Sequence, residues 1–329
     1  MKHIFMMHDT KRHHDLEGMI HDIMQEYVYE IVYTTSMQDS QKYIQNCLEP
    51  SRFYAVGGDG TINGLLQALV HSEHELVILP FGTGNDFCRT LTKEKDIRQL
   101  LIQSLKQESQ KVDTIQINDR YYLNAACFGL DSMIANKVHD IPDIPFVPES
   151  QSYIISIFKQ VFRYDNHHVK IVSDGKCLYD NQTILCTLNN AQYYGGGFQI
   201  TPQAQIQDGY MDICVVDRVP KIKIPYLVTY LLSHQLHKRH EVHYYKVKEA
   251  TVYCRHSCNI DGEEYKADSY YFQVCPQSLN LVMYKKADMN KSFIVTYSIS
   301  FFITYNYNDF LFLLTTRIPT LISANEAIK

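Results

Sequence analysis

A glycine-rich segment at residues 56–63 has the composition of a phosphate-binding loop. It reads Val-Gly-Gly-Asp-Gly-Thr-Ile-Asn, follows an apolar run at 53–56, and leads into an apolar helical pattern at 65–69. Consecutive glycines let backbone N–H groups converge on an anion, and a helix start adds the positive end of its dipole. Asp59 would repel a phosphate, so its carboxylate is useful mainly if Mg²⁺ lies between it and a nucleotide. The alternative is an ordinary strand-to-helix turn with Asp59 as the N-cap.

A second segment, residues 79–89, repeats this composition after another apolar run at 76–79. It reads Leu-Pro-Phe-Gly-Thr-Gly-Asn-Asp-Phe-Cys-Arg and supplies small residues, a hydroxyl, an amide and an acid. In an open α/β sheet, the carboxyl ends of parallel strands point to one edge, where ligands bind. The two loops are therefore predicted to face each other across one crevice, which favours a phosphate site over two unrelated turns.

Two further acids stand close together in the sequence Asp261-Gly262-Glu263. Taken alone, Asp-Gly between apolar runs is most typical of a hairpin turn. Near a nucleotide, such a carboxylate could instead accept the proton of an attacking hydroxyl, because phosphoryl transfer requires mainly positioning, charge neutralisation and a late proton acceptor. Only the presence of the two glycine loops in the same chain favours the role as proton acceptor over the hairpin turn.

The elements that must position these residues follow two different patterns. Up to about residue 123, short apolar runs at 2–7, 29–34, 53–56 and 76–79 alternate with helical spacing, which predicts βαβ units and a parallel sheet. From 124 to 286, β-branched and aromatic runs separated by turn residues predict an antiparallel β-sandwich. Strands are expected there at 168–172, 183–189, 211–216, 250–255, 270–275 and 279–284, and helices at 152–164 and 224–234.

The predicted organisation is therefore an N-terminal α/β domain (1–123), a β-sandwich domain (124–286) and an apolar tail (287–329). The tail lacks the uninterrupted stretch of about 20 apolar residues that a transmembrane helix needs. A net charge of −5 argues against a general nucleic-acid binder. Nine scattered cysteines without a CxxC pair, and an N-terminus unlike a signal peptide, favour a cytoplasmic protein.

In order and spacing, these motifs resemble the bacterial diacylglycerol kinase and lipid kinase family, which is related to sphingosine kinase. The resemblance covers roughly residues 50 to 285. It begins at the two glycine loops and continues at 126–131, 189–190, 195–198, 202–204, 208–212 and 260–263. It implies an ATP-dependent kinase that phosphorylates a lipid hydroxyl at the inner face of a membrane, with diacylglycerol as the expected acceptor and phosphatidic acid as the product.

The same resemblance implies roles for single residues. Asp261 would be the general base, with Glu263 as a second candidate, and Asp59 would act through Mg²⁺ and water. The Asp208 side chain, with the backbone carbonyls of Gln205 and Tyr210, would hold a structural Mg²⁺ ion. The residues expected around ATP are Thr35, Gly57, Gly58, Asp59, Gly60, Thr61, Ile62, Asn63, Thr83 and Asp86.

The chain departs from the family in its first turn. Members usually carry an Asn-Pro-x-Ser-Gly turn that contacts the nucleotide, whereas this chain has Met-His-Asp-Thr-Lys at 7–11. Because the glycine of this turn is missing, the affinity for ATP and the identity of the nucleotide could differ from those of the family. Two alternatives stay open, a kinase of another lipid or of a soluble hydroxyl, as in NAD kinases, and a catalytically silent lipid-binding protein.

Membrane approach has two candidate segments. Residues 141–148 place apolar side chains on a proline-stiffened loop, and the tail at 293–322 is aromatic and aliphatic but interrupted by polar residues. The partner expected there is the lipid substrate at the membrane surface, with peripheral attachment to the inner face. The oligomeric state is left open, and a homodimer is one option. The histidines at 234, 237, 240 and 243 and the Lys238-Arg239 pair are interpreted as solvated surface.

Overall fold

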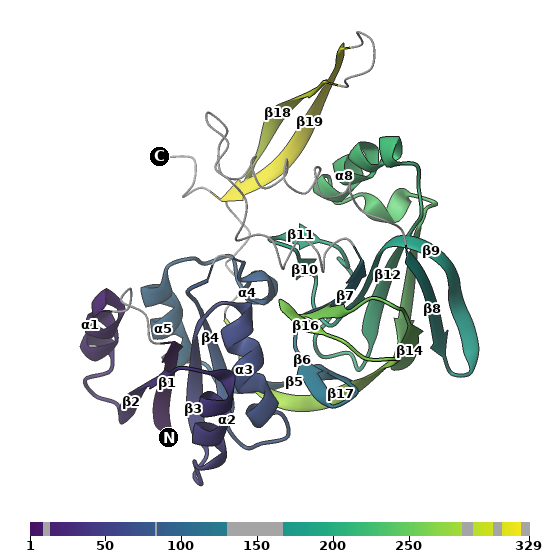
Figure 1. Ribbon diagram of the computed structural model, residues 1–329. Helices are drawn as coiled ribbons and strands as arrows, with labels where there is room; N and C mark the ends of the chain where they lie inside the picture. The colour runs from purple at the N-terminus through teal and green to yellow at the C-terminus, as the bar shows by residue number, and fades with distance from the viewer. Residues whose placement is uncertain (9–13, 83, 130–166, 285–291, 305–310, 324–329) are drawn as a thin grey trace.

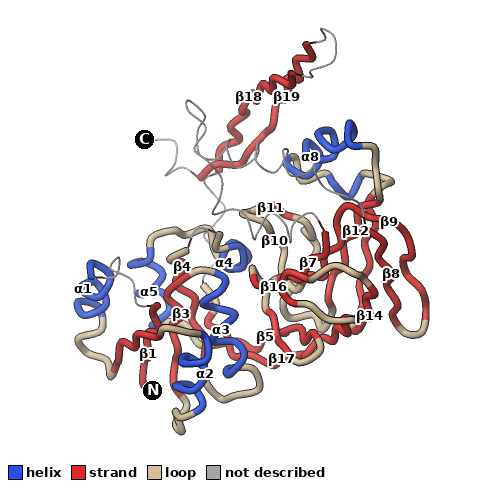
Figure 2. The backbone as a smooth tube through the Cα atoms, in the orientation of Figure 1, coloured by secondary structure: helices blue, strands red, loops and turns tan. Residues whose placement is uncertain are grey.

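The computed structural model describes residues 1–8, 14–82, 84–129, 167–284, 292–304 and 311–323 (Figure 1). Strands alternate with helices in the first half and dominate the second half (Figure 2). The first half contains β1 (Lys2–His8), α1 (His14–Ile23), β2 (Tyr29–Thr34), α2 (Met37–Gln45), β3 (Ser51–Gly57), α3 (Asp59–Leu69), β4 (Glu75–Pro80), α4 (Asp86–Leu91) and α5 (Ile97–Leu105).

The second half begins at β5 and is built from the following elements. They are β5 (Ser109–Ile117), β6 (Arg120–Tyr122), β7 (Ala125–Gly129), β8 (His167–Ser173), β9 (Lys176–Asn189), β10 (Tyr193–Tyr194), β11 (Phe198–Gln199), β12 (Met211–Asp217), the 3₁₀ turn η2 (Lys221–Lys223), α8 (Ile224–Leu232), the 3₁₀ turn η3 (Leu236–Lys238), β13 (Val242–Val247), β14 (Glu249–Tyr253), β15 (Cys258–Ile260), β16 (Glu263–Tyr265) and β17 (Tyr270–Val282).

The first half is organised around parallel strands in the order β4-β3-β1-β2. The side chains of β3 and the middle of β1 and β4 are buried on both faces, which explains why these strands read as continuous apolar runs. Between them, the rings of Phe5 and Tyr54 stack with their centroids 4.2 Å apart. The parallel α/β architecture and its predicted strands are confirmed.

The second half is antiparallel, as predicted, and packs apolar residues against both faces of its sheet. Since alternate residues of a strand point to opposite faces, Ala126 belongs to one core, and its neighbour Cys127 belongs to the other. Helix α8, predicted at 224–234, covers the second of these cores. The predicted helix at 152–164 and the loop at 141–148 lie outside the described residues.

Strand β17 differs from the prediction of two separate strands at 270–275 and 279–284. It is one strand with a bulge between Cys275 and Leu279, where Gln277 adopts a φ of 51°. The buried Asp113 carboxylate accepts the Gln277 N–H at 2.8 Å and so holds the bulge against β5. Beyond the bulge, β17 pairs with the parallel strand β4, which joins the two halves in one sheet.

The described part of the tail consists of β18 (Ser292–Thr304) and β19 (Leu311–Ser323). These strands pair with each other as a separate antiparallel hairpin. Among the helices that the structure describes, none has the length and apolarity needed to cross a membrane.

Candidate active site

The two glycine loops lie against each other, as the sequence predicted. Gly57 at the end of β3 is the register partner of Pro80 at the end of β4, so both chains leave the sheet at the same edge. A Cβ on Gly82 would lie 2.5 Å from the Gly58 Cα, and one on Gly57 would lie 2.2 Å from the Thr61 Oγ1. Contacts this short leave no room for side chains, so glycine is required for the close approach.

Asp59 stands in the first turn of α3 and reaches across to the second loop. The N-cap of α3 is Gly58, so the alternative interpretation of Asp59 as N-cap is wrong. Its carboxylate instead accepts the backbone N–H groups of Asp86 at 3.3 Å and Phe87 at 3.5 Å, at the start of α4. Burial raises the pKa of the Asp59 carboxyl, and these backbone hydrogen bonds oppose the shift.

Asp86 connects the nucleotide half to the second half of the molecule. Its Oδ2 accepts the Gly196 N–H at 2.8 Å, and the Arg89 Nε lies 3.6 Å from its Oδ1. Burial raises the pKa of Asp86 to about 6, and the nearby Asp59 charge adds to the shift. The glycine run at 195–197, part of the family resemblance, thus meets the second loop directly.

Asp261 is a buried carboxylate at a backbone φ of 47°, in the left-handed region that Asp tolerates better than most residues. It accepts the backbone N–H groups of Leu123 at 3.0 Å, Asn124 at 3.2 Å and Ala125 at 2.9 Å. Burial raises its pKa to about 6, with a further contribution from the Asp59 charge. A carboxyl with this pKa is ionised at neutral pH and well matched to accepting a proton.

Helix α3 links Asp261 to the phosphate loop. The Asn63 Nδ2, one turn after Asp59, donates to the Asp261 Oδ2 at 3.4 Å. Gln67 fixes the same helix to β6, because it exchanges hydrogen bonds with the Tyr121 backbone at 2.7 and 3.0 Å. The contact from Asn63 is the longest that the Asp261 carboxylate makes, so an incoming hydroxyl could replace it most easily.

Glu263 lies at the mouth of this arrangement. Its side chain is exposed, and its Oε1 would lie 3.6 Å from a Cβ on Gly60. The Asp261-Gly262-Glu263 turn therefore faces the start of α3. The structure brings Asp59, Asp86, Asn63, Asp261 and Glu263 together around the two glycine loops.

The remaining predicted nucleotide residues are less central. Thr35 is exposed after β2, and its hydroxyl donates to the Asp39 carboxylate at 2.6 Å, in the first turn of α2. Ile62 is buried in the core around the parallel strands of the first half, which indicates a packing role for its side chain. Thr83 and the departure at 9–11 lie outside the described residues.

The predicted structural Mg²⁺ site at Gln205, Asp208 and Tyr210 contains a lysine. The Lys246 Nζ lies 2.6 Å from the Asp208 Oδ2, while the Asp208 Oδ1 accepts the Tyr210 N–H at 3.1 Å. Lys246 is the cross-strand partner of Asp212 between β12 and β13, so the strand register places its ammonium group here. In this structure the Asp208 carboxylate is paired with a cation and accepts hydrogen bonds through both oxygens, and its role as a Mg²⁺ ligand stays a prediction.

A catalytic Mg²⁺ fits the glycine loops better. The buried Asp86 carboxylate lies near the half-buried Asp59 carboxylate, and the Asp86 Oδ1 has no hydrogen-bond partner among the described residues. No group of three His, Cys, Asp or Glu side chains within the described ranges is placed to hold a metal directly. An ion here would therefore be held chiefly by nucleotide phosphates, with Asp59 contributing through water.

The sequence reasoning missed Asp113. This buried carboxylate on β5 accepts the Gly209 N–H at 2.7 Å and the Gln277 N–H at 2.8 Å, so it fixes both the 208–210 turn and the β17 bulge. The feature of the sequence that could have revealed Asp113 is a single acidic residue inside the apolar run at 112–117, because a charge buried there needs hydrogen-bond partners.

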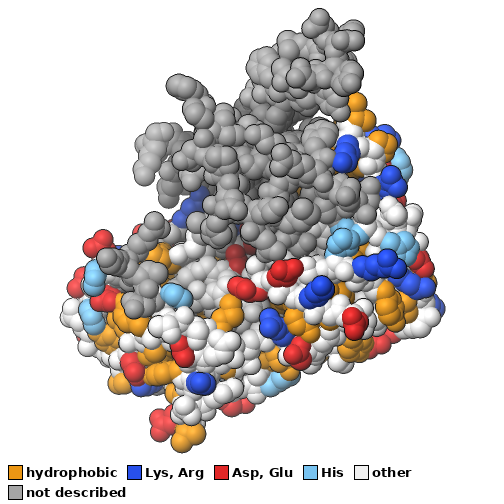
Figure 3. Space-filling model, viewed as in Figure 1, with side chains coloured by type: hydrophobic (Ala, Val, Ile, Leu, Met, Phe, Trp, Pro, Cys, Tyr) orange, Lys and Arg blue, Asp and Glu red, His pale blue; other side chains and the backbone are white. Residues whose placement is uncertain are grey.

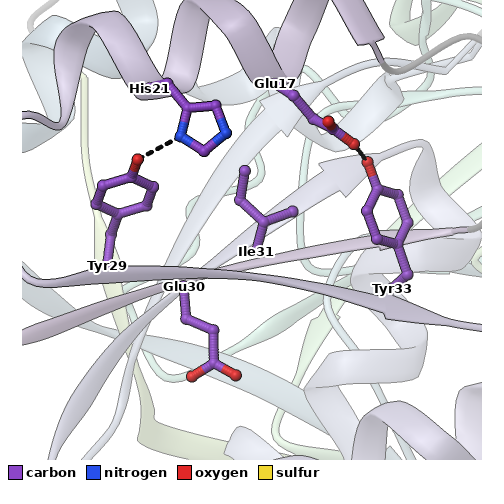
Figure 4. A pocket seen from close by; sticks show the side chains of 6 residues that line it. All are labelled: Glu17, His21, Tyr29, Glu30, Ile31 and Tyr33. Atoms are coloured by element: carbon purple, nitrogen blue, oxygen red, sulfur yellow. Dashed lines mark hydrogen bonds between the residues drawn. The ribbon is translucent and has the colours of Figure 1, made fainter.

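An open pocket of about 500 Å³ lies apart from the glycine loops, between α1 and the edge strand β2 (Figure 4). His21 hydrogen-bonds to Tyr29 across it, and Tyr33 donates to Glu17. Its lining residues are Glu17, His21, Tyr29, Glu30, Ile31 and Tyr33. None of the predicted site residues lines it.

Two models of known protein families match this chain, one after the other along the sequence. The model of the diacylglycerol kinase catalytic domain matches residues 9–117, and that of the YegS C-terminal NAD kinase beta sandwich-like domain matches residues 124–283. The chain belongs to the diacylglycerol kinase and YegS-like lipid kinase family. It is a kinase of this family, and both matched regions contribute residues to the site described above.

Individual relatives of this family are distant. A probable lipid kinase YegS-like from Shewanella frigidimarina is 25% identical over 235 residues, covering 69% of this chain and 74% of the relative. A diacylglycerol kinase from Staphylococcus saprophyticus is 28% identical over 218 residues, covering 64% and 69%. The crystal structure of a diacylglycerol kinase from Bacillus anthracis shares the fold, with a TM-score of 0.68 at 22% identity, covering 86% of this chain and 96% of that one.

Proposed function

We propose that the protein transfers the γ-phosphoryl group of ATP to a lipid hydroxyl, with diacylglycerol as the acceptor and phosphatidic acid as the product. The observation that carries this proposal is the contact between Asn63 and Asp261. It sets a proton acceptor from the second half beside the helix that begins at the glycine loop of the first half. A nucleotide bound at the glycine loop and a hydroxyl bound at Asp261 would therefore lie next to each other.

The residues would divide the reaction as follows. The backbone N–H groups at Gly57–Thr61 and the N-terminus of α3 would hold the phosphates of ATP. Mg²⁺ would neutralise phosphate charge when bound. As the bond from the acceptor oxygen to the γ-phosphorus forms and the bond to the ADP oxygen breaks, Asp261 would take the hydroxyl proton.

We propose that the protein works in the cytoplasm, peripherally at the inner face of the membrane. Support comes from the chemistry of the proposed acceptor, since diacylglycerol resides in the bilayer. The names of the relatives, diacylglycerol kinase and lipid kinase, agree with such an acceptor.

Transfer of labelled phosphate from ATP to a panel of lipids in mixed micelles tests this proposal, with and without Mg²⁺. We expect labelled phosphatidic acid from diacylglycerol only when Mg²⁺ is present. NAD in detergent-free buffer serves as the soluble acceptor. Labelling of NAD without labelling of any lipid would replace the lipid kinase with a kinase of a soluble hydroxyl.

A further inference from the structure

Residues 221–240, comprising η2, α8 and η3, present apolar and basic side chains side by side. Ile222 is 79% exposed and Tyr226 is 48% exposed, which is unusual for large apolar residues of this protein. Lys223, directly before α8, and Lys238, in η3 after it, are both exposed. In Figure 3 this region, at the upper right, shows orange, blue and pale blue atoms together. We call Lys221, Ile222, Lys223, Tyr226, Tyr230 and Lys238 the α8 surface.

The α8 surface rests on a firm support. Ile224, Leu227 and Leu236 point inward and are buried in the core that also contains Val216. The exposed residues are therefore held on one side of an anchored helix. Such a helix can present apolar side chains to a partner without unfolding.

The outer aromatic side chains are also fixed. Tyr226 and Tyr230 share a hydrogen bond of 2.9 Å between their hydroxyls, and the Arg239 guanidinium lies 4.9 and 5.1 Å from their ring centroids. Arg239 is in turn paired with Glu241 at 3.0 Å. Tyrosine with an apolar ring and a polar tip is typical of the boundary between water and lipid.

The charge of this segment is opposite to that of the whole chain. No Asp or Glu occurs from residue 218 to 240, whereas the segment contains two arginines and three lysines. The complete chain has a net charge of −5. The concentration of cations here therefore favours an anionic partner, and the exposed apolar side chains among them favour one with an accessible apolar interior.

The α8 surface lies on the same face of the sheet as the proposed base. Cys127, in the core under α8, is the register partner of Asn259, so both point to that face. Tyr194 belongs to the same core, and its hydroxyl donates to the Asn259 Oδ1 at 3.0 Å. Asn259 precedes Asp261 by two residues, so the layer that carries α8 extends to the catalytic turn.

We propose that the α8 surface docks the enzyme on an anionic lipid bilayer. The inference rests on the proposed lipid kinase activity. Docking through the α8 surface would bring a hydroxyl that is embedded in the bilayer towards Asp261. Ile222 and Tyr226 enter the headgroup boundary, and the flanking lysines bind anionic headgroups. This surface differs from both segments suggested by the sequence, at 141–148 and 293–322.

Vesicle flotation of the full chain tests the proposal. The probes are vesicles of phosphatidylcholine alone and of phosphatidylcholine mixed with phosphatidylglycerol. The charge variant is Lys223→Gln/Lys238→Gln, and the apolar variant is Ile222→Asp. The matched controls are Lys106→Gln/Lys111→Gln and Leu48→Asp, at exposed positions outside residues 221–240. Each lysine near an anionic surface contributes about fivefold to binding, so the charge variant should bind about 30-fold more weakly.

We expect the wild-type chain and both controls to bind the anionic vesicles and both α8 variants to lose binding. Activity on short-chain diacylglycerol dispersed in detergent should stay unchanged in all variants, because none of these residues touches the site. Equal flotation of variants and controls, or no flotation of the wild type, would overturn the proposal. If flotation follows the expectation but no lipid is phosphorylated, the docking surface stands and the kinase proposal fails.

Discussion

The proposed base, Asp261, is subject to two opposing influences on its protonation. Its carboxylate is held in place by three backbone N–H groups, which favour the ionised form, while burial favours the protonated form. The net result is a pKa of about 6. The carboxylate is thus positioned accurately and still basic enough to accept a proton near neutral pH.

The pH dependence of turnover follows from this value. Asp261 acts as a base only when ionised, so kcat/KM should rise with pH up to about 6 and level off above it. Initial rates across about pH 5 to 8, at constant ionic strength and saturating Mg²⁺, measure this profile. A rate that is flat through pH 6 would show that another group accepts the proton.

Asp86 provides a stability prediction of definite sign. Its pKa is raised from the 3.8 of an ordinary aspartate to about 6 in the folded chain, so its ionisation opposes folding. The folded state gains stability from protonation as pH falls from above 6 towards 4. Asp86→Asn should therefore raise the free energy of unfolding at pH 7.5, by up to about 3 kcal/mol. Denaturant unfolding at pH 7.5 and pH 5 measures this, and a variant less stable than the wild type at pH 7.5 would contradict it.

Lys246 supplies a cation at the turn where the sequence predicts a Mg²⁺ ion, and we expect it to take the place of that ion. With its ammonium group on Asp208, the melting temperature of the nucleotide-free wild type should be the same in EDTA and in Mg²⁺. Lys246→Met should lower the melting temperature, because it leaves the Asp208 and Asp212 carboxylates without their cation. A rise in the wild-type melting temperature with Mg²⁺ that Lys246→Met leaves intact would restore the predicted metal site.

At the scale of elements, the strand-to-helix connections build the crevice. The parallel register of β3 and β4 determines that the two glycine loops meet, and glycine permits the contact distance. The sequence predicted this meeting because apolar runs followed by small residues are visible in the chain. It could not predict that Asp59 would bind the start of α4, since such a contact depends on how closely the loops approach.

A pair of glycine substitutions tests the loop contact. Gly82→Ala would place a Cβ 2.5 Å from the Gly58 Cα, so the loops must separate, at a cost of about 1–3 kcal/mol, and nucleotide affinity should fall. The matched control is Gly18→Ala, inside α1, where a Cβ has no neighbour within 4 Å and should stabilise the helix by about 0.5–1 kcal/mol. ATP binding and thermal unfolding of both variants check this. Unchanged ATP affinity in Gly82→Ala would show that ATP binding does not depend on the contact between the loops.

At the scale of the whole molecule, β17 holds the two halves together. Its first part, with Tyr270 and Phe272, belongs to the second-half core that contains Ala126. Its last part, with Leu279 and Leu281, belongs to the core around the parallel strands of the first half. Apolar runs predicted both parts as strands. The single bulged strand was not predictable, because it depends on Asp113, a residue distant in sequence.

This shared strand predicts cooperative unfolding. Leu281→Ala removes buried side-chain volume where β17 meets β4 and should destabilise the protein by about 2–5 kcal/mol. Because β17 also belongs to the second-half core that contains Ala126, unfolding should stay a single transition at a lower temperature. Differential scanning calorimetry measures this, and two resolved transitions in the variant would show that the halves unfold independently.

The measurement that tests the central claim most directly compares turnover and ATP binding in Asp261→Asn. The amide keeps the size of the side chain but cannot accept the hydroxyl proton, so lipid phosphorylation should fall by about 10²- to 10⁴-fold. ATP affinity should change little, since the glycine loops that would hold the phosphates belong to the first half. Near-normal phosphorylation by a folded Asp261→Asn variant would contradict the assignment of Asp261 as the base and, with it, the proposed mechanism.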